Sequence, residues 1–161
     1  MKKSFSIIFL CILLLVGCSP ESSYTEEKAL ENDDIVIRNL TSSMQGIIPG
    51  QQKVHNLEQL NQFQRKAEAG EATELTISIF DVDSNNGVVN QLSYENQLYL
   101  FQNHYNKYGQ ATGDYTCKGP ITMEIVTVVK GCELDGKQTD DVVLFLASVS
   151  SVREAKAKAK K

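Results

Sequence analysis

Thr73-Glu74-Leu75-Thr76-Ile77-Ser78-Ile79-Phe80 is the stretch that decides the fold class. Leu75, Ile77 and Ile79 fall on one face of an extended chain, and the hydroxyl side chains between them fall on the other. A period of two over eight residues is typical of a half-buried β-strand, and the branched residues favour it further. The segment therefore predicts a strand with one face in the core.

Other segments share this pattern. Val142–Ser148 is apolar on both faces, which predicts a central strand. Most connections are too short for helical crossovers, so hairpins and a mainly antiparallel sheet are expected. The further expected strands are Ile35–Leu40, Val88–Tyr94, Leu98–Tyr105, Ile121–Lys130 and Val142–Ser148.

One helix is expected between the strands at Ile35–Leu40 and Thr73–Phe80. Asn56 is positioned as its N-cap, with Gln59 three residues later to complete a capping box. Apolar residues follow at helical spacing, at positions 57, 60, 63 and 67, and Gly70 is placed to end the helix. The predicted fold is α+β, with one helix packed on a mainly antiparallel sheet of about four to six strands.

Length and composition set limits on the class of protein. The chain has 161 residues, of which 42% are hydrophobic and 22% charged, and its net charge is −4. These values are ordinary for one globular domain and exclude a wholly disordered chain, a collagen-like chain and a polytopic membrane protein. The acidic balance argues against a nucleic-acid partner.

The N-terminus has the features of an export signal. Lys2 and Lys3 precede an unbroken apolar run, Ile7–Val16, which is shorter than the about 20 residues of a membrane-spanning helix. Leu15-Val16-Gly17-Cys18 then resembles a bacterial lipobox. That resemblance implies a lipoprotein signal peptide over residues 1–17, a diacylglyceryl group on the Cys18 thiol, and a protein held by palmitate-type chains on the outer face of the cell membrane. The alternatives are an uncleaved short anchor and an accidental cysteine in a signal peptide.

The remaining chain divides by composition into three parts. Residues 18–34 are polar and predict a flexible tether behind the lipidated cysteine. Residues 35–150 predict a single α+β domain. Residues 151–161 predict a basic tail, since five basic residues and one glutamate follow Val152, and Ser151 with Glu154 matches a capping box. A solvated tail is favoured over a patch that touches anionic lipid or wall polymers.

Cys117 and Cys132 are the cysteines that follow Cys18. Outside the membrane such a pair more often forms a disulfide bond than a redox or metal site, and no C-x-x-C spacing is present. One straight strand over these residues would place the two cysteines about 50 Å apart, so a bond requires a chain reversal. Gly119-Pro120 bends the chain near one end, but nothing marks a turn at Met123-Glu124. A disulfide bond between Cys117 and Cys132 is favoured, but the sequence does not show the reversal that it needs.

Two other segments offer alternatives to a purely structural role. Asp81–Gly87 has Asn86 where a calcium loop needs glycine, so a polar hairpin loop is favoured over a weak cation site. The aromatic side chains of the tyrosine-rich hairpin and its exit are expected to pack across strands and in the core rather than to line a small-ligand site. Its aromatic residues are Tyr94, Tyr99, Phe101, Tyr105 and Tyr108.

No nucleophile with a local base, phosphate loop or metalloprotease motif is found in the sequence. We therefore expect no enzyme, no metal and no cofactor. The expected function is that of a lipid-anchored extracytoplasmic lipoprotein, a non-catalytic binding or structural module with a cell-envelope partner. The alternative is a lipoprotein that binds a small ligand or a cation through the tyrosine-rich hairpin or the Asp81–Gly87 loop.

Several short segments together carry a family resemblance. They are residues 54–63, Thr76–Ile79, Lys107-Tyr108-Gly109, Tyr115–Lys118 and Gly131-Cys132. In this arrangement the chain resembles small lipoproteins of bacillus-type Gram-positive bacteria that carry domain of unknown function four-three-six-two. The resemblance spans roughly residues 50–132. It implies secretion, lipidation and a disulfide bond between Cys117 and Cys132, and it implies no activity.

Overall fold

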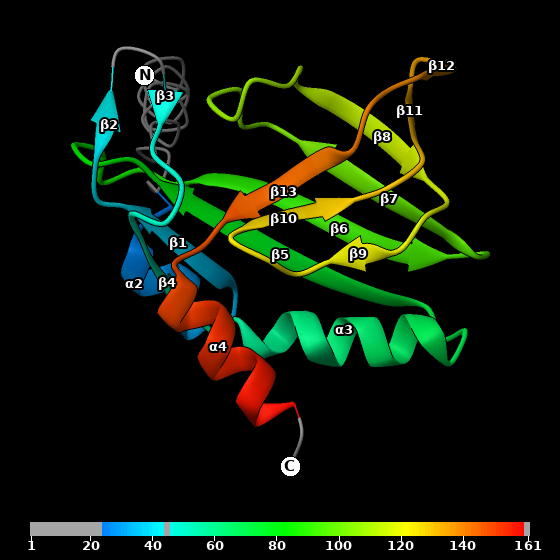
Figure 1. Cartoon of the computed structure of the whole chain (residues 1–161), viewed down its shortest axis with the longest axis horizontal. Coiled ribbons are helices and arrows are strands. Elements are labelled where there is room, and N and C mark those ends of the chain that lie inside the picture. Colours follow the sequence, from blue (N-terminus) through cyan, green and yellow to red (C-terminus); the bar gives the residue numbers. More distant parts are fainter. Residues whose placement is uncertain (1–23, 44–45, 160–161) are drawn as a thin grey trace, which may run out of the picture.

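The computed structural model describes residues 24–43 and 46–159, and the fold over these residues is α+β (Figure 1). An eight-stranded sheet has the strand order β12-β11-β8-β7-β6-β5-β1-β4, a three-stranded sheet has the order β13-β10-β9, and β2 pairs with β3. The eight strands of the large sheet are β1 (Ile35–Asn39), β4 (Gln52–His55), β5 (Thr73–Phe80), β6 (Val88–Glu95), β7 (Leu98–Asn103), β8 (Gly113–Cys117), β11 (Cys132–Leu134) and β12 (Lys137–Gln138). The other strands are β2 (Ser42–Ser43), β3 (Gly46–Ile47), β9 (Ile121–Thr122), β10 (Val126–Val129) and β13 (Val142–Leu146).

The large sheet is mainly antiparallel, as predicted, but it contains more strands than expected. β5, β6, β7 and β8 form an antiparallel meander, and β1 joins it by parallel pairing with β5. The helix α3 (Glu58–Glu68) connects β4 to β5 and makes this one parallel pair possible. The strand predicted at Thr73–Phe80 is confirmed, and Ile77 and Ile79 are buried in the main core. Its other face is also buried at Ser78 and Phe80, which the alternation did not predict.

Helix α3 packs its apolar stripe against the sheet, with Leu60, Phe63 and Ala67 buried. Its predicted start is wrong: Asn56 has a φ of 56° and its Nδ2 donates to the Asp34 carbonyl at 3.0 Å instead of capping the helix. The predicted end is confirmed. Gly70 has a φ of 77°, its N–H donates to the Ala67 carbonyl, and the next N–H reaches back to residue 66, as in a Schellman motif.

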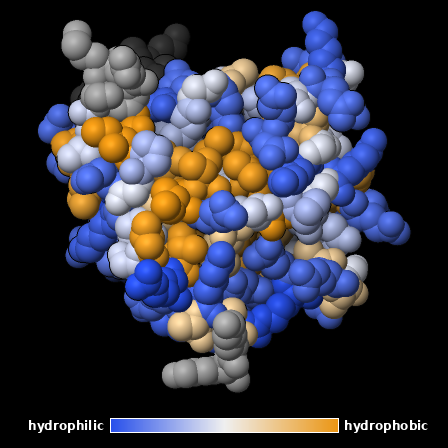
Figure 2. Space-filling model, viewed as in Figure 1, coloured by the Kyte–Doolittle hydropathy of each residue, from blue (hydrophilic) through white to orange (hydrophobic). Residues whose placement is uncertain are grey.

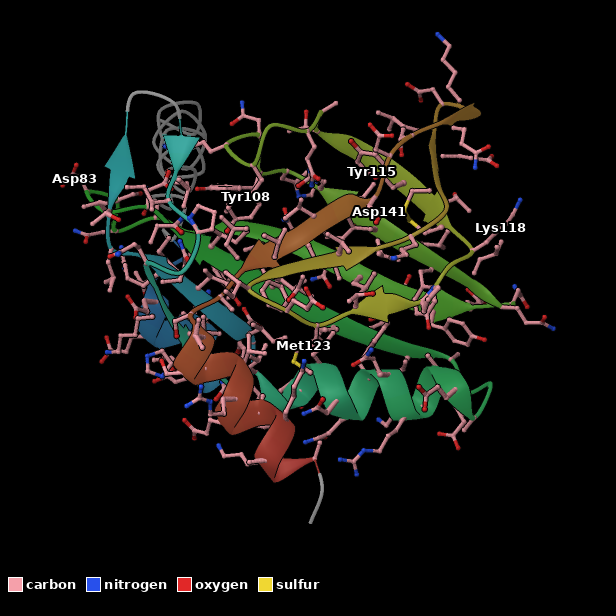
Figure 3. The ribbon with its side chains drawn as sticks, in the orientation of Figure 1. Asp83, Tyr108, Tyr115, Lys118, Met123 and Asp141 are labelled. Carbon is pink, nitrogen blue, oxygen red and sulfur yellow. A yellow bond between two sulfur atoms is a disulfide. The ribbon has the colours of Figure 1, made fainter. Side chains whose placement is uncertain are left out.

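The prediction of one strand over Ile121–Lys130 is wrong. The chain forms β9 and β10, which pair antiparallel through Thr122 and Val128, so it reverses at residues 123–125. The prediction of a central strand over Val142–Ser148 is also wrong, since β13 lies at one end of the three-stranded sheet. Its apolar faces are buried because the small sheet packs in the same core as the large one (Figure 1). Met123 lies between the small sheet and α3 (Figure 3).

The predicted tether is too long. Helix α2 (Glu26–Glu31) is capped by Thr25, and Ala29 packs with Val36 and Phe80 in a second small core. Asp34, which is 4% exposed, accepts hydrogen bonds from the Tyr24 hydroxyl at 2.6 Å and the Ser78 hydroxyl at 2.5 Å. The folded domain therefore begins by Tyr24. The predicted signal peptide, Cys18 and the tether up to residue 23 lie outside the described residues.

The predicted basic tail is also part of the domain. Helix α4 (Val149–Lys158) is capped by Ser148, whose Oγ accepts from the Ser151 N–H at 3.1 Å, and it buries Val152 and Ala155. The capping box predicted at Ser151 is wrong, because the helix begins three residues earlier than that box requires. Within residues 24–43 and 46–159, no helix combines the length and apolar character needed to cross a bilayer.

Candidate functional site

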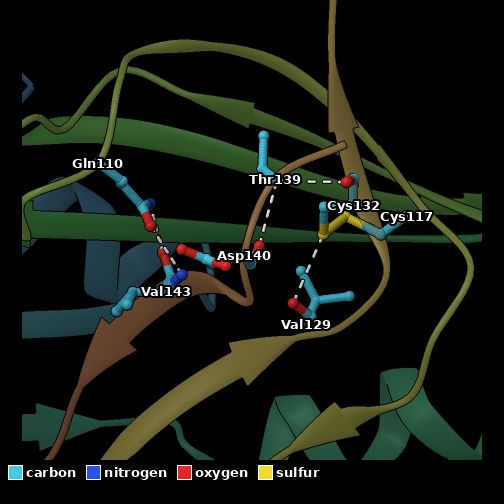
Figure 4. Close-up of a disulfide and its surroundings, with 7 residues drawn as sticks. All are labelled: Gln110, Cys117, Val129, Cys132, Thr139, Asp140 and Val143. Carbon is cyan, nitrogen blue, oxygen red and sulfur yellow. Dashed lines mark hydrogen bonds between the residues drawn. A yellow bond between two sulfur atoms is a disulfide. The ribbon is translucent and has the colours of Figure 1, made fainter. Parts of the chain in front are cut away.

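Cys117 and Cys132 form a disulfide bond between β8 and β11 (Figure 4). The two residues are directly opposite in the sheet, and both are fully buried. The reversal at residues 123–125 returns the chain to β8, and the Gly119 N–H then donates to the Lys130 carbonyl at 2.9 Å. This reversal is the feature that the sequence did not mark. Because the sulfur atoms are bonded to each other and buried, we assign the pair a structural role.

The Asp81–Gly87 segment is the hairpin loop between β5 and β6, and two of its carbonyl oxygens accept hydrogen bonds from Arg38. The Arg38 guanidinium donates to the carbonyls of Asp81 at 2.7 Å and Ser84 at 2.8 Å, and to Glu26 Oε2 at 2.6 Å. Arg38 therefore stands where a cation would meet the loop carbonyls. Asp83 lies at the outer end of the loop (Figure 3). In the part of the chain that the structure describes, no group of three or more metal-ligating side chains comes together.

The carboxylate of Asp81 has a network of its own. It accepts from the Tyr105 hydroxyl at 2.6 Å and forms an ion pair with Lys107. Burial alone would raise the pKa of Asp81, but the hydrogen bonds from Lys107 and Tyr105 outweigh it and lower this pKa below its usual value. Burial, followed by the bond to Asp81, raises the pKa of the Tyr105 hydroxyl.

The aromatic residues of the predicted hairpin pack in pairs. Tyr94 and Tyr99 are cross-strand partners whose ring centroids lie 5.0 Å apart, and Tyr105 and Tyr108 pair at 4.6 Å. Phe101 is fully buried in the core. The preference for cross-strand and core packing is confirmed, and Tyr108 also lines a pocket of about 300 Å³ beside Val126 and Val143.

A hydrophobic groove that sequence reasoning missed lies between α4 and the β9–β10 turn, and we call it the α4 groove. Its volume is about 800 Å³, and Val126 and Val149 in its lining are 38% and 52% exposed. Figure 2 shows a continuous hydrophobic patch on this face, over β13, β10 and the beginning of α4. The lining residues are Glu124, Ile125, Val126, Val149, Val152, Arg153, Lys156 and Ala157.

The α4 groove carries two cations that have no acidic partner. Arg153 and Lys156 form no ion pair among the described residues, whereas Lys158 on another face of the helix pairs with Glu58 and Glu154. Glu124 is the acidic residue of the lining. The spacing of the α4 residues in the groove could be seen in the sequence. Ile125 and Val126 could not be assigned to a surface, because Ile121–Lys130 was predicted to be one strand.

A second, polar pocket of about 560 Å³ lies between β4, the start of α3 and α4. It contains His55 and three serines, a combination that invites comparison with a hydrolase site. Ser148 instead bonds to Ser151 at 2.8 Å and to Ser150 at 2.9 Å. Among the described hydrogen bonds none joins His55 to a serine, so this pocket lacks the base–nucleophile contact of such a site.

Comparison of the chain with family models, with curated proteins and with solved structures found no match in any of the three. The resemblance to lipoproteins with domain of unknown function four-three-six-two stays a prediction, and the function is argued from the chain alone.

Proposed function

We propose that the protein is a lipid-anchored extracytoplasmic lipoprotein whose folded domain is a non-catalytic binding module at the membrane surface. The observation that carries the proposal is the Leu15-Val16-Gly17-Cys18 motif behind a basic and apolar leader. The buried disulfide bond between Cys117 and Cys132 supports the same compartment, because such bonds persist outside the reducing cytosol.

The length of chain between the lipid and the domain supports a membrane-proximal role. The folded domain begins by Tyr24, six residues after Cys18. At most about 3.5 Å of reach per residue gives a link of about 20 Å, shorter than the about 35 Å diameter of a domain of this size. Lipidation at Cys18 would therefore hold the domain against the membrane rather than far above it.

The chemistry of the described residues supports binding over catalysis. Among the described hydrogen bonds, none joins His55 to a serine of the polar pocket, and two carbonyls of the Asp81–Gly87 loop are occupied by Arg38. Because Arg38 already contacts these carbonyls, they argue against the alternative that the Asp81–Gly87 loop binds a cation.

Metabolic labelling with palmitate tests the proposal, with Cys18→Ala as the variant and Cys11→Ala as the matched control. Cys11 lies inside the apolar run, so its loss should leave labelling intact. We expect label on the wild-type chain and on Cys11→Ala, none on Cys18→Ala, and a mature chain that begins at Cys18. A labelled Cys18→Ala protein, or a mature chain that begins elsewhere, would contradict the proposal.

A further inference from the structure

We infer that the α4 groove is a docking surface for an anionic lipid bilayer, with its apolar residues in the headgroup region and its two cations against the phosphates. The inference deepens the proposed function, and it rests on that function for the domain's position beside a membrane. The contact itself is a property of described residues and does not depend on the lipid at Cys18.

The helix presents one face to the groove. Val149, Val152, Arg153 and Lys156 stand at positions i, i+3, i+4 and i+7, which share one side of an α-helix. Lys158 and Glu154 pair with each other, and Lys158 reaches Glu58 on α3, so these charges belong to the domain's own packing. The outward face therefore combines the exposed Val149 with cations that no protein group neutralises among the described residues, while Val152 on the same side is buried in the main core.

The apolar part of the surface comes from two elements that are distant in sequence. Ile125 ends the β9–β10 reversal and Val126 begins β10; they are 37% and 38% exposed and line the groove together with Val149. Figure 2 shows that this patch continues over β13. Exposed patches of this kind mark interaction sites, and an interfacial helix buries such residues about 5–10 Å into the headgroup boundary.

Charge complementarity selects the lipid as the occupant. The chain as a whole is acidic, with 20 acidic and 16 basic residues, so a basic rim on an apolar patch is a local departure from the molecule's charge. Arg153 and Lys156 have aliphatic stems that can lie along the apolar surface while their charged ends reach phosphates. Glu124 opposes this attraction and should weaken it.

The position of the anchor favours the same occupant. With a link of about 20 Å, lipidation at Cys18 would keep the domain's local concentration at the bilayer high, so even a weak contact would be populated.

Vesicle sedimentation tests the inference with the mature chain from residue 18 carrying Cys18→Ser, which has no lipid and keeps every described residue. One vesicle is phosphatidylcholine, and the other is phosphatidylcholine and phosphatidylglycerol in equal parts. We expect sedimentation with the second vesicle only, and a decrease as salt is added. Equal sedimentation with both vesicles, or none with either, would overturn the inference.

Charge variants locate the contact. Arg153→Glu with Lys156→Glu should lower the partition coefficient by about tenfold or more. The matched control, Lys66→Glu with Lys137→Glu, changes the net charge equally at two exposed lysines outside the groove lining and should stay close to wild type. Val149→Ser should weaken binding, and Glu124→Gln should strengthen it.

The inference fails if the groove variants and the control pair bind alike, since the attraction would then be diffuse. It also fails if the chain dimerises without vesicles and the groove variants abolish that dimer, because a second copy would then be the occupant. Palmitate labelling of the full chain is independent of these measurements. Vesicle binding without labelling would overturn only the lipoprotein proposal, and labelling without vesicle binding only the docking surface.

Discussion

Gln110 completes the hydrogen bonding of β13 without belonging to a strand. Its Nε2 donates to the Val143 carbonyl at 2.6 Å, and its Oε1 accepts from the Val143 N–H at 2.7 Å (Figure 4). One side-chain amide thus acts as a neighbouring strand would for one residue. Because β13 is the end strand of the small sheet, this contact protects an edge that would otherwise lack partners.

Replacing Gln110 with alanine should destabilise the small sheet. The change leaves the Val143 N–H and carbonyl without their partners, and we expect a loss of about 1–2 kcal/mol in the free energy of unfolding. Urea denaturation measures it, with Gln102→Ala as the control because that side chain is exposed on β7. Equal denaturation midpoints for the two variants would show that the amide contact contributes nothing.

Removing the disulfide bond should lower the free energy of unfolding more than Gln110→Ala does. The bond closes a loop with a sequence separation of 15, for which the chain-entropy model gives about 3 kcal/mol. We expect the Cys117→Ala and Cys132→Ala double variant to unfold at lower urea concentration. A reducing agent should lower the wild-type midpoint toward that of the double variant and leave the double variant unchanged. A wild-type midpoint that is indifferent to full reduction would contradict the expectation.

Arg38 joins α2, β1 and the β5–β6 loop. Its guanidinium makes four hydrogen bonds, two to Glu26 and two to loop carbonyls, and lies 4.9 Å from the Phe80 ring. A lysine cannot reproduce this forked geometry, so Arg38→Lys should lower the free energy of unfolding by about 2 kcal/mol or more. Backbone amides in residues 81–87 should also exchange faster. Arg65→Ala, an exposed change on α3, is the control, and an equal effect of the two changes would refute this role.

The Asp81 network predicts a pH dependence of stability. The pKa of Asp81 is lowered in the folded state below its usual value of 3.8, so the folded state binds this proton less readily than the unfolded state does. The contribution is therefore present above about pH 4 and is lost as the pH falls through the folded pKa. We expect Asp81→Asn to cost about 1 kcal/mol near neutral pH, a modest value because the site is partly exposed.

Thermal unfolding across the acidic range checks this dependence. The difference in melting temperature between wild type and Asp81→Asn should shrink below about pH 4. Asp83→Asn is the control, because Asp83 is exposed at the outer end of the same loop and forms no ion pair among the described residues. A difference that stays constant with pH would mean that the charge of Asp81 is not what stabilises the network.

Local sequence patterns were sufficient for the strands and the helix that have clear periodicity. The alternation in Thr73–Phe80 and the glycine after residue 69 act over a few residues, and β5 and the end of α3 match the predictions. The disulfide bond was favoured from the expected compartment and is present, but the reversal that brings the two cysteines together was not predicted. Ile121–Val129 consists mostly of β-branched residues and contains neither glycine nor proline, so nothing local distinguishes one strand from two.

The errors at the two ends of the domain have a related cause. Residues 24–34 are mostly polar, yet Ala29 and Asp34 are buried because Val36, Phe80 and Ser78 offer a matching surface on the far face of the sheet. In the same way, α4 is held by a few apolar contacts and by the Asn61 side chain, which donates to the Ala155 carbonyl at 3.1 Å. Composition cannot show such partners, since they come from distant parts of the chain.

The sequence by itself determined the fold class, the helix stripe, the candidate lipidation motif and the two cysteines available for pairing, because each is a short-range property of residue type and spacing. The tertiary structure alone decided that those cysteines meet, that Arg38 occupies two loop carbonyls, and that Val126 and Val149 line one groove beside two cations that form no ion pair among the described residues. These relationships join residues that are 15 or more positions apart, and only the packing of the two sheets and α4 sets the distances between them.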